Sequence, residues 1–474
     1  MKKKDDMRFE DATYNKIRVE GLAGNPLAEA IPLRKSLEDF DDEIACEVEI
    51  PIDIDEFSVE DKEQQAMKIM SSVSPTSLYY DMYCDLLNVL KMSYEVRNPL
   101  SDSWKKHQNI VAAGKAKKKV TKTTGGAISF FGLSGTGKST LVDSVLNLLP
   151  DVLIHKNSGP LGYNFNQIIY IKCDIAGTDN PKEICLKILD HIDEVTGEEL
   201  SKEYRKSGYK VTDCIDRLIT TCSTQNIGML IFDEVQNIEL TKPNGRKQIF
   251  SLFHRLNNEA KVPVVSIGTN KALKLFQDEF TNLRRLGLSN DLTNYKLNDP
   301  DWQVLVEYAW SYQLVGEPLD LTLERMKLIY SLTAGVPYCL FFLMEQANIK
   351  AIRSGKNDID DKLLKEVYQL KFKFMRPALI ALRLGKTAAY DDIYCAIKDA
   401  DKDHNAFVKK LLKISHQHKF KGEAAQAIME QIEPYLLEYT ATKTEEETLK
   451  RLTKNLDLIP SDIQSAGNEL VLPI

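Results

Sequence analysis

The sequence contains no uninterrupted apolar run approaching the roughly 18 residues of a membrane-spanning helix. Its first residues, MKKKDDMRFED, include lysines but no apolar segment behind them, so we expect no secretory signal. The eight cysteines are scattered and form no CxxC pair, which is typical of reduced, mostly buried thiols in a cytoplasmic protein. Neither an integral membrane protein nor a disulfide-stapled secreted domain is expected.

An excess of positive charge is also absent, because 62 Lys and Arg face 69 Asp and Glu for a net charge of −7. This balance excludes a protein coated in positive charge, whereas a local basic patch can still bind phosphates. Lysines cluster between Lys105 and Lys122 and between Lys409 and Lys421, either as nucleic-acid contacts or as solvated surface and linker. His416 and His418 lack a cysteine or carboxylate at metal-ligand spacing, so no metal site is predicted there.

The middle of the 474-residue chain does contain a regular alternation, although there is no internal repeat. Short apolar, β-branched runs alternate with amphipathic helical patterns, and the runs occupy 127–133, 167–175, 228–234 and 263–269. Continuous apolar runs suit strands that are buried on both faces of a parallel sheet. The alternation therefore predicts a doubly wound α/β core.

Changes in composition divide the chain into four regions. Residues 1–95 are mixed, with a helical-looking stretch over 59–90, and are interpreted as an N-terminal partner-binding region. Residues 96–298 hold the α/β core, and helical periodicity predicts an all-helical lid over 299–382. Residues 383–474 form a charged, helical-looking extension whose end, ELVLPI, is either a docking peptide or a frayed terminus.

The stretch GLSGTGKS after the first apolar run fits G-x-x-x-x-G-K-[ST] at every position. Glycines let backbone N–H groups turn inward around a phosphate, and the helix that follows directs its positive dipole end at the same anion. Lys138 would reach the β- and γ-phosphates of ATP, and Ser139 would ligate Mg²⁺. The candidate nucleotide-binding residues are Gly132, Leu133, Ser134, Gly135, Thr136, Gly137, Lys138, Ser139 and Thr140.

Two acidic residues end the apolar run MLIFDE. An Asp-Glu pair at the end of a buried strand is costly unless the site favours negative charge. After a phosphate loop, Asp233 is expected to hold Mg²⁺ and Glu234 to orient and activate the attacking water. The order of the two motifs makes ATP hydrolysis the favoured activity.

Polar and basic residues follow the next apolar run. Thr269 and Asn270 are candidates to sense the γ-phosphate, with an ordinary strand-to-helix turn capped by Asn270 as the alternative. Arg284 and Arg285 are candidates to stabilise charge on the transferring phosphoryl group, or else are a surface pair.

The order of phosphate loop, acidic strand, sensor strand, Arg pair and helical lid resembles the AAA+ ATPases. Within them the sequence is most similar to the TnsC/TniB group of transposition regulators over residues 20–385. The stretches that carry the resemblance are NPLAEAIPL, RNPLSDSWKKHQ, GLSGTGKSTLVDSVL, QIIYIKCDIAGTDNPKEICLKIL, GMLIFDEVQNI, VPVVSIGTNKALKLF and LRRLG. One departure is the turn LTAGVPYCLFFL, which lacks the lid arginine that touches the γ-phosphate in many AAA+ relatives.

This resemblance implies a bacterial, nucleoid-associated protein that assembles on double-stranded DNA as a ring or filament in its ATP-bound state. It would receive a signal from a target-selection protein, recruit or activate a transposase, and be reset by hydrolysis. The Arg pair would act in trans between subunits. Basic residues near the long segment between the two motifs are candidate DNA contacts, or else solvated side chains: Lys182, Lys206, Lys210, Lys242, Arg246 and Lys247.

Two other functions fit the same motifs. One is a signalling or defence ATPase that oligomerises without DNA, although the region after the lid is too short for a solenoid array. The other is a replication initiator or helicase loader, for which residues 388–414 resemble a helix-turn-helix only faintly.

Overall fold

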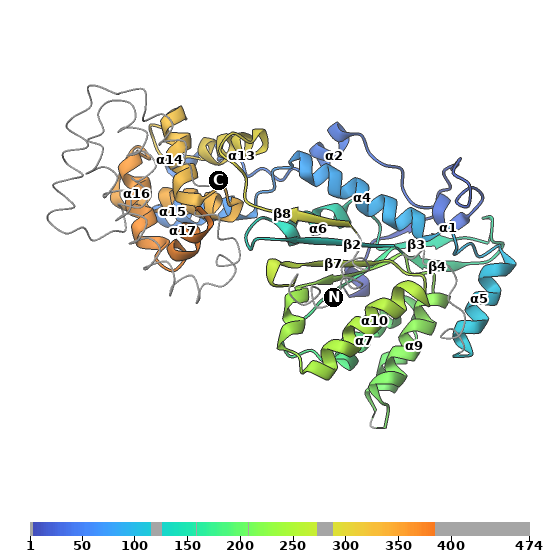
Figure 1. Cartoon of the computed structure of the whole chain (residues 1–474). Coiled ribbons are helices and arrows are strands. Elements are labelled where there is room, and N and C mark those ends of the chain that lie inside the picture. Colours follow the sequence, from blue (N-terminus) through green and yellow to red (C-terminus); the bar gives the residue numbers. More distant parts are fainter. Residues whose placement is uncertain (1–2, 115–125, 158, 207, 273–287, 384–474) are drawn as a thin grey trace, which may run out of the picture. The chain divides into compact units, whose positions relative to one another are not determined.

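The computed structural model describes residues 3–114, 126–157, 159–206, 208–272 and 288–383 (Figure 1). The chain divides into two compact units, each considered by itself. The first comprises residues 1–45, 75–132 and 137–292, and the second comprises 46–74, 133–136 and 293–474, as far as these are described.

The first unit is built on a five-stranded sheet whose strands are all parallel. Its strands, in spatial order, are β5 (Tyr170–Asp174), β6 (Met229–Asp233), β7 (Val264–Thr269), β2 (Ala127–Gly132) and β8 (Leu288–Leu292). All five residues of β6 are buried, as are five of the six in β2. This explains why the strands appear in the sequence as continuous apolar runs.

Helices cover both faces of this sheet (Figure 1). On one face lie α4 (Ser77–Ser93) and α6 (Lys138–Asn147), and on the other lie α7 (Pro181–Thr196), α9 (Val211–Thr224) and α10 (Pro243–Asn258). Helices α7, α9 and α10 bury their apolar faces against strand residues and against one another in one hydrophobic core, and α4 and α6 also bury apolar side chains such as Leu86 and Leu141. The doubly wound α/β class predicted from the alternation of runs is confirmed.

A second, three-stranded sheet in this unit was not predicted. It consists of β1 (Phe9–Asp11), β3 (Val152–His155) and β4 (Phe165–Ile168), in the order β1-β3-β4. The run at 167–175 was expected to be one strand, but it divides at Ile169 between the two sheets. Ile169 N donates to Asp151 O at 2.9 Å, whereas the next residue starts the pairing of β5 with β6.

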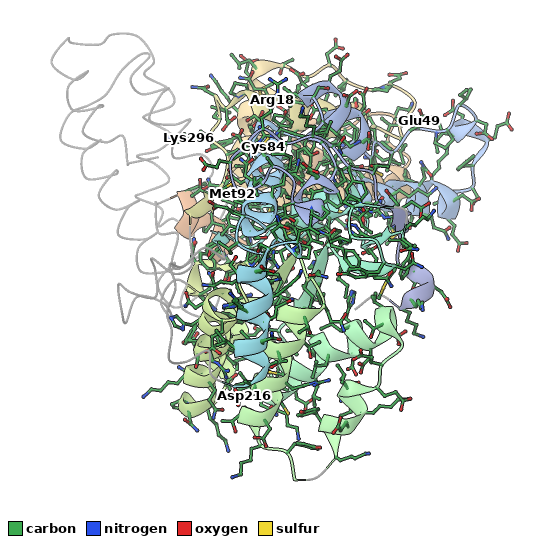
Figure 2. The ribbon with its side chains drawn as sticks, turned by 90° about the vertical axis from the view of Figure 1, so that its right-hand side faces the viewer. Arg18, Glu49, Cys84, Met92, Asp216 and Lys296 are labelled. Carbon is green, nitrogen blue, oxygen red and sulfur yellow. The ribbon has the colours of Figure 1, made fainter. Side chains whose placement is uncertain are left out.

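The remaining helices of the first unit are short. They are η1 (Lys4–Asp6), α1 (Pro26–Glu29), α2 (Leu37–Ile44), α5 (Asp102–Ala112), α8 (Leu200–Arg205) and η5 (Val235–Leu240). Asp216, labelled in Figure 2, lies on α9 and pairs with Arg255 of α10 at 2.7 Å. Arg255 also pairs with Glu259 one helical turn later, so this ion-pair network ties α9 to α10.

The second unit is all helical where it is described, as predicted for the lid. It contains α13 (Pro300–Ser311), α14 (Leu323–Thr333), α15 (Pro337–Ser354), α16 (Asp361–Lys371) and α17 (Arg376–Arg383). Among the described residues, no single helix is long and apolar enough to cross a membrane. Helices α14 and α15 reach that composition only as a pair, and they are bent by 111° at the break between them.

A segment from the N-terminal part of the chain packs inside this helical unit. It carries η2 (Ile54–Glu56), α3 (Val59–Met67) and η3 (Lys68–Ser71). Tyr312 Oη donates to Gln65 O at 2.6 Å, and Arg353 forms a two-pronged ion pair with Glu63. The helical-looking stretch over 59–90 thus forms α3 and α4, which belong to different units.

Candidate functional site

The phosphate loop joins the end of β2 to the start of α6. Gly137 has a left-handed φ of +86°, a backbone conformation that a side chain disfavours. At Gly132, a Cβ would lie 2.1 Å from the carbonyl oxygen of Leu292 on the neighbouring strand. Backbone rather than side-chain atoms therefore line the turn, as a phosphate cradle requires.

Lys138 is buried at the first position of α6, and its Nζ donates to Gly132 O at 3.2 Å. This contact holds the ammonium beside the carbonyl group at the start of the loop. Thr136 Oγ1 donates to Leu133 O at 2.9 Å, and this hydrogen bond links the two ends of the crest of the loop, residues 133–136. Ser139 is half-buried, while Ser134 and Thr140 are exposed. The nine candidate residues thus form one continuous strand–loop–helix connection, and their binding role stays a prediction.

The crest of the loop, residues 133–136, belongs to the second unit. Tyr338 N, at the start of α15, donates to Gly135 O at 3.1 Å. A Cβ on Gly135 would lie 3.1 Å from Tyr338 Cβ, and the φ of this glycine is +80°. Sequence reasoning missed Tyr338, because nothing in the local sequence pairs the phosphate loop with the GVPYC turn.

Helix α4 contributes Tyr79, whose hydroxyl lies 3.1 Å from the place where a Cβ on Gly137 would stand. The far end of α4 is anchored by the buried Arg97. Its guanidinium donates to Ser93 O at 2.9 Å and to Gly228 O at 3.1 Å, just before β6. Burial lowers the pKa of Arg97 to about 10. Apart from the helical pattern of α4, no local sequence feature indicates this arrangement.

Asp233 ends β6 and is buried. Its Oδ1 accepts a hydrogen bond from Glu234 N at 2.8 Å, and its Oδ2 lies 3.2 Å from Lys172 Nζ. Lys172 also pairs with Asp143 of α6 at 2.6 Å. Burial alone would lower the pKa of Lys172, but hydrogen bonding to Asp143 and the neighbouring carboxylates outweigh it and raise the pKa above its ordinary value.

Glu234 has a left-handed backbone, with φ +57° and ψ +36°, which is unfavourable for a residue with a side chain. Such strain persists where the surroundings impose it, often at functional sites. The short helix η5, which follows Glu234, brings Gln236 close to the Glu234 side chain, and Gln236 Nε2 donates to Glu234 Oε2. The same carboxamide accepts a hydrogen bond from Thr269 N at 3.0 Å through its Oε1.

Thr269 ends β7 and pairs in register with Gly132, where the phosphate loop begins. Thr269 Oγ1 and Asn270 Oδ1 are buried and have no hydrogen-bond partner among the residues that the structure describes. Buried polar atoms without partners carry a free-energy cost. They are therefore suited to contact a ligand with polar oxygens or a water molecule at this edge of the sheet.

These features fit Mg-ATP. The loop offers backbone amides and Lys138 to phosphates, and the end of β7 offers two polar atoms that lack partners within the described part of the chain. Ser139 and Asp233 provide the hydroxyl and carboxylate oxygens that Mg²⁺ prefers. Among the described residues, no group of three His, Cys, Asp or Glu side chains could hold a metal by itself, so a metal here depends on phosphate oxygens as well.

Five of the six candidate DNA contacts lie around the first turns of α7, α9 and α10, and the sixth, Lys206, lies at the C-terminal end of α8. Thr241 Oγ1 donates to Asp179 O at 3.3 Å, which joins the start of α10 to the start of α7. Lys182 Nζ donates to Tyr209 O at 3.3 Å, which brings in the start of α9.

The six side chains differ in how far they are engaged. Lys182 and Arg246 are occupied with backbone carbonyls. The other four are exposed: Lys206, Lys210, Lys242 and Lys247.

Several sequence predictions lie outside the described residues. They are Arg284 and Arg285, His416 and His418, the lysine cluster over 409–421 and the terminal ELVLPI. The lysine cluster at 105–122 lies partly outside them. Their roles stay predictions.

Sequence comparison relates the middle of the chain to a known family. Residues 121–276 match the family described as AAA domain. None of the curated proteins matches the chain. The matched range includes the phosphate loop, Asp233, Glu234 and Thr269, and it carries four strands of the parallel sheet, β2, β5, β6 and β7, whereas β8 lies beyond it. These residues are therefore similar to an AAA domain, and the part of them that the structure describes has a P-loop AAA+ fold.

Solved structures resemble the chain at low identity. The ORC2 protein of Aeropyrum pernix, in ADPNP and ADP complexes, shares 13% identity over 78% of this chain and 91% of that chain, with a TM-score of 0.36. Cdc6p from Pyrobaculum aerophilum shares 14% over 81% and 88%, with a TM-score of 0.39. The RuvB branch migration motor of Thermotoga maritima shares 14% over 75% and 94%, with a TM-score of 0.31. Values this low transfer no function to the chain.

Proposed function

We propose that this AAA-type ATPase domain binds and hydrolyses Mg-ATP, and that the protein uses the cycle as a switch for assembly on duplex DNA. One observation carries the proposal. Gly132 pairs with Thr269 in the sheet, and Gln236 joins Thr269 to Glu234. One edge of the sheet thus connects three features. They are the start of the phosphate loop, the polar atoms at the end of β7 that lack partners among the described residues, and the acidic turn at Glu234.

Each group has a distinct task in hydrolysis. Lys138 and the loop amides hold the phosphates, and Glu234 orients and deprotonates the attacking water. Thr269 and Asn270 contact the terminal phosphate or that water through atoms for which the described residues supply no other partner. Mg²⁺, held by Ser139 and Asp233, supplies charge neutralisation for the phosphates when bound.

The basic residues around α7, α9 and α10 support binding to DNA. Of the four exposed lysines, Lys210 lies at the N-terminus of α9, and Lys242 and Lys247 lie at that of α10, where the helix dipoles add to the positive potential; Lys206 lies at the C-terminal end of α8. Charge neutralisation adds up when each subunit of an assembly repeats the same contacts, so a chain of net charge −7 can still bind DNA. We therefore assign this face to the phosphate backbone rather than to base reading.

The resemblance to the TnsC/TniB group supports a more specific role. In that role a ring or filament on DNA links a target-selection protein to a transposase, and hydrolysis resets it. Arg284 and Arg285 complete the site of a neighbouring subunit. The protein is then cytoplasmic and associated with the bacterial nucleoid. The stretches DEVQNI and IGTNKA carry this proposal, since the phosphate loop alone is common to many ATPases.

Electron microscopy of the full chain with duplex DNA and a non-hydrolysable ATP analogue tests the assembly. We expect rings or filaments that need both components, weaken with salt and disappear with ADP. A variant with Lys206, Lys210, Lys242 and Lys247 changed to glutamate should bind the analogue and lose assembly on DNA. Assembly that is equally good without DNA would contradict the DNA role and favour a signalling scaffold.

Mixing experiments test the Arg pair. Arg284→Ala or Arg285→Ala should reduce turnover of the assembled protein, and mixing with Glu234→Gln should restore part of it if the arginine acts in trans. Stimulation of a transposase rather than loading of a helicase would support the transposition role over replication initiation.

A further inference from the structure

We propose that Gln236 is a positioning residue of the hydrolytic site, which couples the orientation of the Glu234 carboxylate to the position of the sensor residue Thr269. The inference rests on the proposed role of Glu234 in ATP hydrolysis. Gln236 was not among the residues predicted from the sequence. Its role is inferred from two hydrogen bonds that link the turn after β6 to the end of β7, two segments that are distant in the sequence.

The bridge is made by one carboxamide. Gln236 Nε2 donates to Glu234 Oε2, and Gln236 Oε1 accepts from Thr269 N at 3.0 Å. A carboxylate only accepts and a backbone N–H only donates, so the two partners fix which way the amide faces. Rotating the amide by half a turn would place its NH₂ against the N–H of Thr269 and its oxygen against the carboxylate.

The sensor strand leaves room for this side chain at Gly268. A Cβ at that position would lie 2.7 Å from Gln236 Oε1 and 2.8 Å from Val235 Cγ2. Any larger residue would push the carboxamide away from Thr269 N. A side chain at position 268 would therefore compete with the Gln236 carboxamide for the same space.

The orientation of Glu234 matters because a general base acts only within hydrogen-bond reach of its water. Among the described residues, Gln236 is the one side chain that hydrogen-bonds this carboxylate. Because Gln236 engages Oε2, Oε1 is the oxygen left to accept a hydrogen bond from water. The left-handed backbone of Glu234 further limits the directions that the side chain can take.

The other end of the bridge lies on the residue proposed to sense the terminal phosphate. Thr269 offers its N–H to Gln236, and its own Oγ1 lacks a partner among the described residues. A ligand bound by Thr269 Oγ1 or Asn270 Oδ1 shifts the end of β7. Gln236 transmits that shift to the carboxylate. Hydrolysis thereby depends on correct engagement of the sensor strand.

Variants of the full chain at position 236 test the proposal. Gln236→Leu keeps the approximate volume and removes both hydrogen bonds, and Gln236→Asn is too short to make both. We expect kcat for ATP to fall by roughly 10- to 100-fold, a part of what a general base contributes. KM and the affinity for an ATP analogue should change by less than about threefold, because nucleotide binding rests on the phosphate loop. A drop in affinity that equals the drop in kcat would overturn the proposal.

The matched control is Asn237→Leu in the same turn. Asn237 Nδ2 donates to Ile175 O at 2.8 Å, and among the described contacts this side chain bonds neither Glu234 nor Thr269. The backbone N–H of Asn237 donates to Glu234 O at 2.9 Å, and the substitution keeps this bond. This variant should lower the unfolding midpoint without a selective loss of kcat. If Gln236→Leu merely loosens the turn, the two variants will show the same ratio of activity loss to stability loss, and the coupling is refuted.

A double-mutant cycle separates this inference from the proposed function. Gln236→Leu should cost little further rate when it is added to Glu234→Gln, since it acts through that carboxylate. Losses that multiply independently would contradict the positioning role. If Glu234→Gln hydrolyses ATP at the parental rate, the proposed function fails. If it is impaired while Gln236→Leu is not, only this inference fails.

Discussion

The ammonium of Lys172 lies 3.2 Å from the carboxylate of Asp233, the proposed Mg²⁺ ligand at the end of β6. The same ammonium pairs with Asp143 on the helix that follows the phosphate loop. The ammonium of Lys172, a residue of β5, therefore links this strand to the end of β6 and to α6. It also compensates a carboxylate whose side chain is only 6% exposed.

Lys172→Met should destabilise the nucleotide-free protein, because it leaves the buried Asp233 without its cation. We expect the free energy of unfolding to fall by about 1–3 kcal/mol, measured by urea denaturation. Lys202→Met removes an exposed ion pair with Glu199 and should leave the urea midpoint nearly unchanged. Equal midpoints for Lys172→Met and the parent would show that the pair contributes nothing.

The left-handed backbone of Glu234 predicts an unusual order of stability among its variants. Glu234→Gly should be more stable than Glu234→Ala by about 1 kcal/mol, since only glycine adopts this conformation without strain. Both should lose hydrolysis. Thermal or urea denaturation of the two variants measures the difference, and the opposite order would refute the strained turn.

Replacing the buried Arg97, which lies outside the nucleotide site, should cause a large loss of stability. Arg97→Ala removes a buried guanidinium and leaves the carbonyls of Ser93 and Gly228 without this donor. We expect a loss of about 2–4 kcal/mol in the free energy of unfolding. Arg97→Lys should recover only part of this stability, because an ammonium cannot donate the same set of hydrogen bonds as the planar guanidinium. Arg34→Ala, at an exposed site, is the control, and a loss as small as that of the control would contradict the account.

His155 predicts a pH dependence of stability. It is fully buried, bonded to Tyr14 and Gln167 at 2.8 Å each, and burial lowers its pKa below the ordinary 6.5. The unfolded chain then takes up the proton first, so the stability contributed by this group is lost as pH falls below about 6.5. The destabilisation caused by His155→Gln should therefore be smaller at pH 5 than at pH 7.5. A difference that is constant with pH would contradict the shifted pKa.

Much of the α/β architecture could be predicted from the sequence, because buried parallel strands leave apolar runs and the helices between them are amphipathic. The phosphate loop and the strands β2, β6 and β7 fall where their runs predict. The three-stranded sheet was missed because its strands are only three or four residues long. Such short strands depend on partners far along the chain for their definition.

The same limit applies to the candidate site. Motif spacing identifies Lys138, Asp233 and Glu234, since their roles follow from position after a strand or before a helix. Lys172 and Gln236 acquire roles only from proximity to residues on other elements, and residue type alone does not reveal that. The offset of two residues between Glu234 and Gln236 in DEVQNI is the one local signal that could have suggested the second.

Removing the ammonium of the phosphate loop tests nucleotide binding separately from chemistry. Lys138→Ala should bind an ATP analogue far more weakly than the parent and lose every ATP-dependent step, because the cation that faces the phosphates is gone. Isothermal titration calorimetry with the analogue and Mg²⁺ measures this. Unchanged affinity would remove the assigned role of the loop.

The most direct test of the central claim is a comparison of Mg-ATP binding and turnover by the full chain and by Glu234→Gln. We expect both proteins to bind ATP, the parent to hydrolyse it, and the variant to be slower by roughly 100-fold or more. Failure of the parent to bind ATP, or turnover by Glu234→Gln at the parental rate, would contradict it.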